Sequence, residues 1–526
     1  MNLEKTASLY RLLLGLIVIS GMATLYVSMG PWGIGVSEDS ISYISGARAF
    51  LKGMGFRHDV RNEPITYFPP LYSLALAGVG LFGLKALEAA KVLQTLLFGV
   101  NAFLIAYFLR KITGSLRISL AGAWLFMTAN AMFVIHTMAW SEPLFFSMIF
   151  PGFYFLRVYL TEGKKRYLFL ACALMGLSCL VRYAGVSVVA SGVLMILLLH
   201  KKDFRHRLKL GICFLAIGLL PLGLCLLRNY LSAEKLINRD LSFHVPTLNY
   251  FQKALNTITT WILPVEFPAS VRLLVFCTAL FLLIGVLLFI VWKEFKFHVL
   301  HALIARPSLG FMAAMIIFLI CNAAMQVAHL FLLNVNTMAN DRHYSPFFVA
   351  SLFIALILCA EWVKAARGSR VVKGVLILLF AGLTSFNLFA LQRNVKDMTQ
   401  NGRAFTSREW QTSPTISKVK TLPENTLIYS NDPSIIYINT GRPASRLPRK
   451  FDKQHSRKQE EAEIRGRYPS QLRRVGKNLQ KKDGYIVFFL ERHRWYKISQ
   501  KELEKVLPVK IQDRLADGII YQANPQ

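Results

Sequence analysis

Residues 37–73 read SEDSISYISGARAFLKGMGFRHDVRNEPITYFPPLYS, a polar and charged segment that lies between two long apolar runs. Ser37 is a favourable N-cap residue, and the two carboxylates that follow it, Glu38 and Asp39, would complement the helix dipole in a first turn. The segment therefore predicts a short helix with Asp39 at its mouth, near the bilayer surface. Such an acid either caps the helix or serves a functional site.

The composition is that of a membrane protein. Apolar residues make up 54% of the chain and aromatic residues 12%, and apolar runs of about 20 residues, the length that spans a bilayer, recur along it. The formal charge of +32 arises from 61 Lys and Arg against 29 acidic residues. Basic loops and anionic lipid head groups explain this excess, so we do not infer nucleic-acid binding. The sequence predicts an α-helical polytopic membrane protein.

We predict eleven spans. They are residues 12–29, 89–109, 118–134, 144–159, two short helices within 167–199 that meet at Arg182, and residues 210–227, 273–292, 309–333, 347–363 and 375–391. Basic residues follow alternate spans, which places the amino terminus in the cytoplasm and the end of the last span outside. The apolar segment 74–82 is too short to cross and predicts an interfacial helix. The long outer loop 228–272 is a candidate lid.

The chain divides into two domains at the end of the last span. Residues 1–391 form the transmembrane domain, which includes the outer loop 30–73, and residues 392–526 form a small extracytoplasmic domain. Strand-like runs at 427–430, 485–490 and 518–521 alternate with helical patterns at 465–479 and 499–506, which predicts an α/β fold. Its many basic residues face either anionic lipid or glycan, or simply solvent.

The predicted topology brings ionisable and polar residues of separate spans to the outer side of the membrane. These residues are Asp39, Glu142, Arg182, Arg228, Asp341, Arg342, His343 and Tyr344. Ionisable groups at span ends are expensive to hold against lipid and are functional candidates for that reason. Glu142 can equally be an acid in the first turn of its span, behind the cap Ser141. Arg182 can equally pair with a buried acid.

Several of these positions fit a known pattern. It consists of Asp39, Tyr43, Ala47 or Ala49, Leu51, Gly53 and the run Phe68, Pro69, Pro70, Leu71 and Tyr72. This pattern resembles the first extracytoplasmic loop of the GT-C glycosyltransferases, the superfamily that includes protein O-mannosyltransferases and aminoarabinose transferases of lipid A. Glu142 after a serine resembles the acid of the second outer loop in many relatives. Arg342 and Tyr344 resemble an Arg-Tyr pair before a Pro-led span, although His343 intervenes here.

The resemblance implies a bacterial inner-membrane enzyme that moves a hexose or pentose, with inversion, from a polyprenyl phosphate to a hydroxyl or amine on the extracytoplasmic side. Such transfer needs a base for the acceptor's proton and cations for the released phosphate. We expect Asp39 to be the base, Arg342, Arg182 and Tyr344 to bind the donor phosphate, and Glu142, Tyr43 and Tyr72 to orient the acceptor. The expected partners are the lipid-linked donor, a lipid, glycan or protein acceptor and membrane lipids.

Cofactors and cysteine chemistry play no part in this interpretation. The first outer loop has no paired acids and the second has no Asp-x-Asp pattern, so the sequence predicts no cofactor, and a divalent metal ion is neither predicted nor excluded. All seven cysteines lie in apolar segments without metal-ligand spacing, which predicts neither a disulfide framework nor a zinc site.

Two interpretations from other classes remain open. A transporter or flippase of a lipid-linked sugar predicts an internal repeat and charges near mid-span. The sequence shows no such repeat, and its polar residues lie at the outer ends of spans. A non-catalytic partner in envelope assembly would carry the same loop in a degenerate form.

The topology predicts which sites react from outside the cell. Single cysteines that replace His58 and Asn340 should be modified by a membrane-impermeant maleimide, because both positions lie in outer loops. Cysteines that replace Lys165 and Gly368 should react only after the membrane is permeabilised. Labelling at position 165 in intact cells would contradict the topology.

Overall fold

The computed structural model describes most of the 526-residue chain. The described residues are 3–237, 243, 245, 246, 248–294, 306–332, 340–450, 467–492 and 497–524. The chain forms two compact units, and each draws on two parts of the sequence: residues 1–30 with 42–399, and residues 31–41 with 400–526. The second unit therefore includes a short piece of the amino-terminal region.

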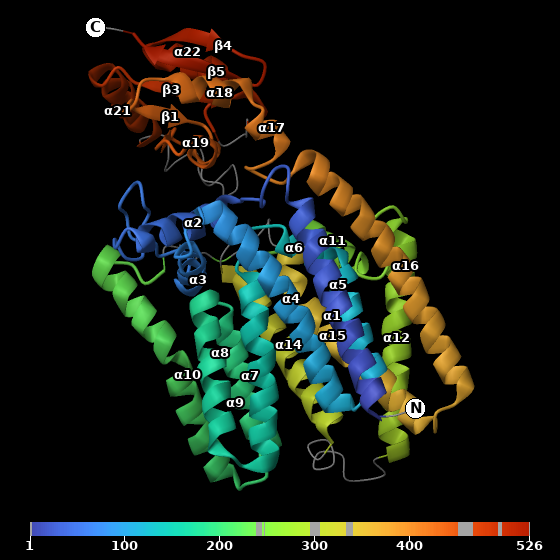
Figure 1. Cartoon of the computed structure of the whole chain (residues 1–526). Coiled ribbons are helices and arrows are strands. Elements are labelled where there is room, and N and C mark those ends of the chain that lie inside the picture. The colour runs from blue at the N-terminus through green and yellow to red at the C-terminus, as the bar shows by residue number, and fades with distance from the viewer. Residues whose placement is uncertain are drawn as a thin grey trace. The chain divides into compact units, whose positions relative to one another are not determined.

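The first unit is a bundle of helices (Figure 1). They are α1 (Leu3–Ser28), α2 (Glu38–Leu51), α3 (Leu71–Gly80), α4 (Ala86–Thr113), α5 (Leu116–Thr128), α6 (Asn130–His136), α7 (Glu142–Glu162), α8 (Lys165–Val181), α9 (Gly185–Leu199), α10 (Phe204–Ala233), α11 (Leu248–Thr259), α12 (Ala269–Glu294), α14 (Pro307–Leu332), α15 (Asp341–Ala365) and α16 (Arg370–Asn401). Helix α2 begins in residues of the second unit and continues into the first.

The predicted fold class is confirmed. Among the described residues, eight helices are long and apolar enough to cross a membrane, or nine if α5 and α6, bent by 60° at their junction, form one span. Helices occupy all eleven predicted segments. The break at Arg182 is also present, since α8 and α9 meet there with only 17 and 15 residues, fewer than the roughly 20 that a full span needs. All seven cysteines lie in helices and are free.

The centre of the bundle is packed by aromatic side chains. The ring of Phe353 on α15 lies 5.3 Å from that of Phe150 on α7 and 5.2 Å from that of Phe311 on α14. These three helices also pack on α4. At the outside of the bundle, α12 and α16 expose large apolar side chains such as Phe281 and Leu378. Side chains of this kind suit helices that face lipid.

The predicted helix after Ser37 is present as α2, and it packs closely on the outer loop. A Cβ atom on Gly46 would lie 2.8 Å from the ring of Phe56 and 2.9 Å from the hydroxyl of Ser73. Only glycine therefore permits this contact without a shift of its neighbours. The predicted helix 74–82 is present as α3, slightly earlier in the chain. Of the candidate lid 228–272, residues 238–242, 244 and 247 lie outside the described residues, and the described part contains α11.

The second unit is a small α/β domain, as expected. Its elements are α17 (Arg408–Gln411), α18 (Pro414–Thr421), β1 (Ile428–Ser430), α19 (Pro433–Thr440), β2 (Ser445–Arg446), α21 (Arg467–Lys481), β3 (Tyr485–Phe489), η1 (Leu490–Arg492), α22 (Gln500–Val506), β4 (Val509–Arg514) and β5 (Gly518–Ala523). The strand order is β2-β1-β3-β5-β4, with the first two pairings parallel and the last two antiparallel.

Amphipathic helices bury one face of this sheet. On α21, Leu472, Val475 and Leu479 recur at helical spacing and pack with strand residues such as Phe488 in one core. Strands β1, β3 and β5 and helices α21 and α22 lie where sequence periodicity predicts them. Strands β2 and β4 were not predicted, because β2 has only two residues and most side chains of β4 are exposed.

The boundary between the two units differs from the predicted domain boundary, which lies between residues 391 and 392. Helix α16 runs on to Asn401, and the boundary between the two units falls at residue 400, near the end of this helix. Residues 31–41 join the second unit because Val36 forms a parallel bridge with Ala404 and its carbonyl accepts a hydrogen bond from the amide of Phe405 at 3.0 Å. Pairing over such a sequence distance leaves no local sequence signal.

Candidate active site

A buried carboxylate holds two arginines in the first unit. Glu142 is fully buried, and its Oε1 accepts a hydrogen bond from Nε of Arg342 at 2.5 Å and another from Nη1 of Arg182. The two guanidinium groups retain side-chain exposures of 10% and 18%. The structure thus brings together three of the predicted site residues.

Each member of this cluster lies at a helix end. Glu142 is the first residue of α7, Arg342 lies in the first turn of α15, and Arg182 follows the last residue of α8 in an extended conformation. The turn at Arg182 depends on Gly185, since a Cβ atom there would lie 2.4 Å from the backbone nitrogen of Cys179. Three separate helix ends therefore supply one charged cluster.

The two oxygens of the Glu142 carboxylate differ in their contacts. Two guanidinium groups share one carboxylate oxygen, while the other oxygen, Oε2 of Glu142, is buried and has no hydrogen-bond partner among the described residues. A buried carboxylate is tolerated only where cations and hydrogen bonds compensate its desolvation. Two arginines share this carboxylate, and guanidinium groups bind phosphate oxygens through paired hydrogen bonds. The arrangement is suited to an anionic ligand.

The alternative explanation of Glu142 as an acid behind a serine cap is incomplete. Ser141 occupies the N-cap position of α7, but its side chain makes no capping hydrogen bond. Its hydroxyl instead accepts a hydrogen bond from Nη1 of Arg182 at 3.2 Å and lies 3.2 Å from the hydroxyl of Tyr43. The sequence distinguishes these two roles of a serine poorly, because both need only a hydroxyl at that position.

Aromatic side chains enclose the cluster. The ring of Tyr43 lies 5.0 Å from that of Phe68 and 5.0 Å from that of Tyr72. The guanidinium of Arg342 lies over the ring of Trp140, 4.8 Å from its centroid, a cation–π contact. Predicted residues Tyr43 and Tyr72 therefore lie beside the arginines, together with Trp140, which was not predicted.

A buried amide fixes this aromatic wall. Nε2 of Gln94, on α4, donates to the hydroxyl of Tyr72 at 2.8 Å and to the carbonyl of Trp140 at 2.6 Å. Burial raises the pKa of Tyr72 well above its ordinary value, against the opposing effect of the Gln94 hydrogen bond, so the phenol stays neutral. In the sequence, Gln94 is a polar residue within an apolar span, and this is the feature by which it could have been identified.

The outer loop is attached to the bundle by two further side chains. Arg228, on α10, donates to the main-chain carbonyls of Phe56 and Ile65, the second at 2.8 Å. The hydroxyl of Tyr183 donates to the carbonyl of Thr66 at 3.0 Å. Arg228 therefore holds the loop in place, whereas the sequence had grouped it with the ionisable candidates.

The remaining candidates make other contacts. The hydroxyl of Tyr344 lies 2.9 Å from that of Tyr250, and the carboxylate of Asp341 accepts a hydrogen bond from Nε1 of Trp261 at 3.3 Å. Asp39 belongs to the second unit and lies in the first turn of α2, one turn before Tyr43 on the same helix.

The fold is that of known glycosyltransferases. ArnT from Cupriavidus metallidurans is similar over 97% of this chain and 98% of its own, with a TM-score of 0.52 and 15% identity; its complex with undecaprenyl phosphate gives a TM-score of 0.53 and 13% identity. The arabinofuranosyltransferase AftD from Mycobacteria is similar over 98% of this chain and 42% of its own, with a TM-score of 0.52 and 12% identity. The oligosaccharyltransferase of Archaeoglobus fulgidus is similar over 92% of this chain and 70% of its own, with a TM-score of 0.50 and 12% identity.

No protein-family model and no curated protein matches the sequence. At these identities the structural similarity establishes the fold. The chain is a polytopic membrane protein with the GT-C fold, which confirms at the level of architecture the resemblance seen in the first outer loop.

The cluster predicts a large stability difference between two acids of the same helix. Glu142→Gln removes the buried carboxylate that pairs with two partly buried guanidinium groups, which should cost about 3–5 kcal/mol. Glu162→Gln removes an exposed ion pair with Lys164 and should leave stability unchanged. Thermal unfolding of the purified variants in detergent measures both effects. Equal midpoints would show that Glu142 does not neutralise the arginines.

Proposed function

We propose that this protein transfers a sugar from a polyprenyl-phosphate donor to an acceptor on the extracytoplasmic side of the membrane. The observation that carries the proposal is the cluster of Glu142, Arg182 and Arg342, which places two arginines around one carboxylate at helix ends within a GT-C fold. A lipid-linked phosphate brings an anionic group and an apolar chain to one place, and this site offers arginines at the end of apolar helices.

In this proposal the two arginines bind the phosphate of the donor. Neither side chain is fully buried, with exposures of 10% for Arg342 and 18% for Arg182. Glu142 orients both groups, and Trp140 supports the Arg342 guanidinium from its face. The complex of ArnT with undecaprenyl phosphate supports the choice of ligand class, because that protein shares the fold over nearly its whole length.

We assign the base to Asp39. Its carboxylate would take the proton of the acceptor hydroxyl or amine as the acceptor atom forms a bond to the anomeric carbon. The bond from that carbon to the phosphate oxygen breaks, and the electron pair leaves with the polyprenyl phosphate. The arginines stabilise the charge that develops on the released phosphate. Attack from the face opposite the phosphate inverts the anomeric configuration.

Tyr43 connects the base to the phosphate site in this scheme. It lies one turn after Asp39 on α2, and its hydroxyl contacts Ser141, which also bonds Arg182. Tyr43 and Tyr72 pack edge to face against each other, and we assign both to orienting the acceptor. Tyr344, which contacts Tyr250, would contribute to the donor side from α15.

The role of Asp39 predicts the effect of one conservative substitution. Asp39→Asn keeps the size of the side chain but cannot accept the proton, so turnover should fall by roughly 100-fold or more. A suitable assay uses purified protein in lipid with a polyprenyl-phosphate sugar and envelope extract, and measures sugar transfer together with release of polyprenyl phosphate.

The matched control is Asp203→Asn. Asp203 caps α10 by accepting the amide of His206 at 3.1 Å, and asparagine caps helices about as well as aspartate, so turnover should not change. Equal transfer by the wild type and by Asp39→Asn would remove Asp39 from the mechanism. Translocation of the lipid-linked sugar without a new glycosidic bond would instead favour a flippase.

A further inference from the structure

The segment that leads into α2 is attached to the second unit by several hydrogen bonds. The hydroxyl of Thr406 donates to the carbonyl of Ile34 at 2.6 Å, and the amide of Phe405 donates to the carbonyl of Val36. Ile34 and Val36 are themselves buried. Trp32 adds two further bonds, since its indole donates to the carbonyl of Gln400 at 3.1 Å and its own carbonyl accepts from Gln411 at 2.8 Å.

The attachment continues into the first turn of α2 through Glu38. Its Oε2 accepts a hydrogen bond from the hydroxyl of Ser434 at 3.0 Å and pairs with Nη2 of Arg446 at 3.5 Å. Glu38 directly precedes Asp39, so these two bonds act on the helical turn that carries the proposed base. The side chain of Glu38 is half exposed, and its partners rather than burial fix its position.

The partners of Glu38 are held by the sheet. Arg446 is the last residue of β2, in register with Ser430 of β1. Ser434 lies in the first turn of α19, the helix that follows β1. Asn431, between β1 and α19, joins β1 to β3 through two hydrogen bonds with the backbone of Phe489, at 2.8 and 2.9 Å. Glu38 is thus anchored to the end of the parallel strands.

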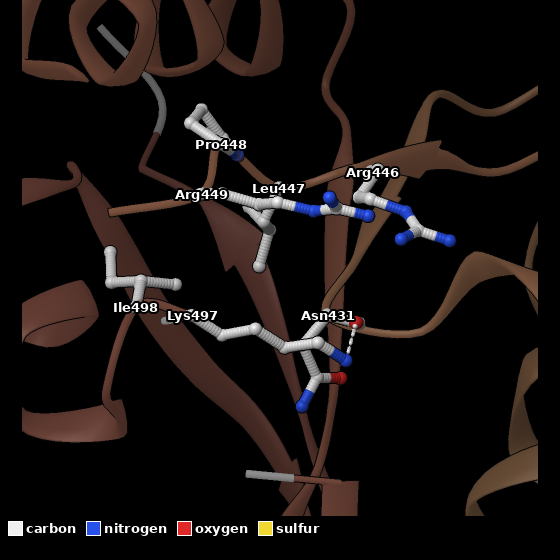
Figure 2. Close-up of a pocket in the computed structure, with 7 residues that line it drawn as sticks. All are labelled: Asn431, Arg446, Leu447, Pro448, Arg449, Lys497 and Ile498. Atoms are coloured by element: carbon white, nitrogen blue, oxygen red, sulfur yellow. Dashed lines mark hydrogen bonds between the residues drawn. The ribbon is translucent and has the colours of Figure 1, made fainter. Parts of the chain in front are cut away.

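The charges around this anchor favour an acid at position 38. Arg446 and Lys497 line one hollow, where Lys497 donates to the carbonyl of Asn431 at 2.7 Å (Figure 2). Burial lowers the pKa of Lys497 to about 8; Asp432 opposes this shift, and Arg446 adds to it. Asp432 is already paired with Arg492 at 2.7 Å. Glu38 therefore supplies the negative charge that pairs with Arg446.

We propose that the second unit is a positioning device for catalysis, in which Ser434 and Arg446 hold Glu38 and thereby fix the turn of α2 that carries Asp39. Glu38, Ser434 and Arg446 are positioning residues, since they act through Asp39 and not on the substrate. The inference rests on the proposed function and deepens it, because it gives the soluble domain a role in the same reaction. Displacement of a reacting group by about 1 Å can cost up to roughly 100-fold in rate.

The test uses the full-length protein in lipid and two kinds of measurement. Glu38→Ala and Arg446→Ala should each lower turnover by about tenfold, with the KM for the donor unchanged, because the phosphate-binding arginines belong to the other unit. The double variant should be no worse than Glu38→Ala alone, since Arg446 acts on α2 through Glu38. Glu424→Ala, an exposed acid of the same unit, is the matched control and should have no effect.

Hydrogen exchange provides a measurement that does not depend on activity. The amides of residues 38–41 should exchange faster in Glu38→Ala, while those of β3 and β5 keep the wild-type rate. Global acceleration would show a folding defect and not positioning. Ser434→Ala, which keeps the charges and removes one hydroxyl, then serves as the second variant and should show the same local acceleration with a smaller loss of turnover.

The outcomes separate this inference from the proposed function. Wild-type turnover in Glu38→Ala and Arg446→Ala would overturn the positioning role and leave the transferase intact. Equal losses in turnover and donor affinity, or additive losses in the double variant, would also overturn it. A wild-type protein that transfers no sugar from any polyprenyl-phosphate donor would remove the proposed function itself, even if exchange at residues 38–41 responded as expected.

Discussion

The carboxylate of Glu142 is fully buried and accepts hydrogen bonds from two guanidinium groups that lie 40 and 200 residues further along the chain. Charges of this kind persist in a protein interior only with their partners in place. The start of α7, the break between α8 and α9 and the start of α15 must therefore meet at one point. The aromatic wall and the outer loop are then attached to the same helices through Gln94, Tyr183 and Arg228.

This constraint also gives the site its chemistry. The cluster that orders three helix ends also presents two arginines, and guanidinium groups bind phosphate through paired hydrogen bonds. The catalytic scheme needs a second component, the first turn of α2, and this turn is held by a different unit of the fold. Binding and proton transfer are thus assigned to separate parts of the chain, with α2 common to both.

Much of the fold could be predicted from the sequence because its signals are local. Apolar runs identified the membrane helices, the interruption at Arg182 identified the junction of α8 and α9, and short strand-like runs identified β1, β3 and β5. Features that depend on distant pairing could not be predicted. Residues 31–41 join the second unit through contacts with residues near 404, and these contacts cannot be predicted from the local periodicity of the sequence.

The candidate site shows the same division between local and distant signals. Arginines and acids at span ends drew attention because charges are rare there, whereas the sharing of Glu142 by Arg182 and Arg342 is a property of the folded bundle. Ser141, Trp140 and Gln94 were missed as site residues because an ordinary serine, tryptophan or glutamine has many structural uses. Arg228 was grouped with the candidates although its bonds to the outer loop explain its position.

The central claim is that the Glu142 cluster binds the phosphate of a polyprenyl lipid. The most direct measurement compares the affinities of the wild type and of Arg342→Lys for undecaprenyl phosphate and for uncharged undecaprenol. The wild type should bind the phosphate at least about tenfold more tightly than the alcohol, and Arg342→Lys should lose most of this preference because a lysine cannot bind two phosphate oxygens in the guanidinium geometry. Equal affinity of the wild type for both lipids, or an unchanged preference in the variant, would contradict the account.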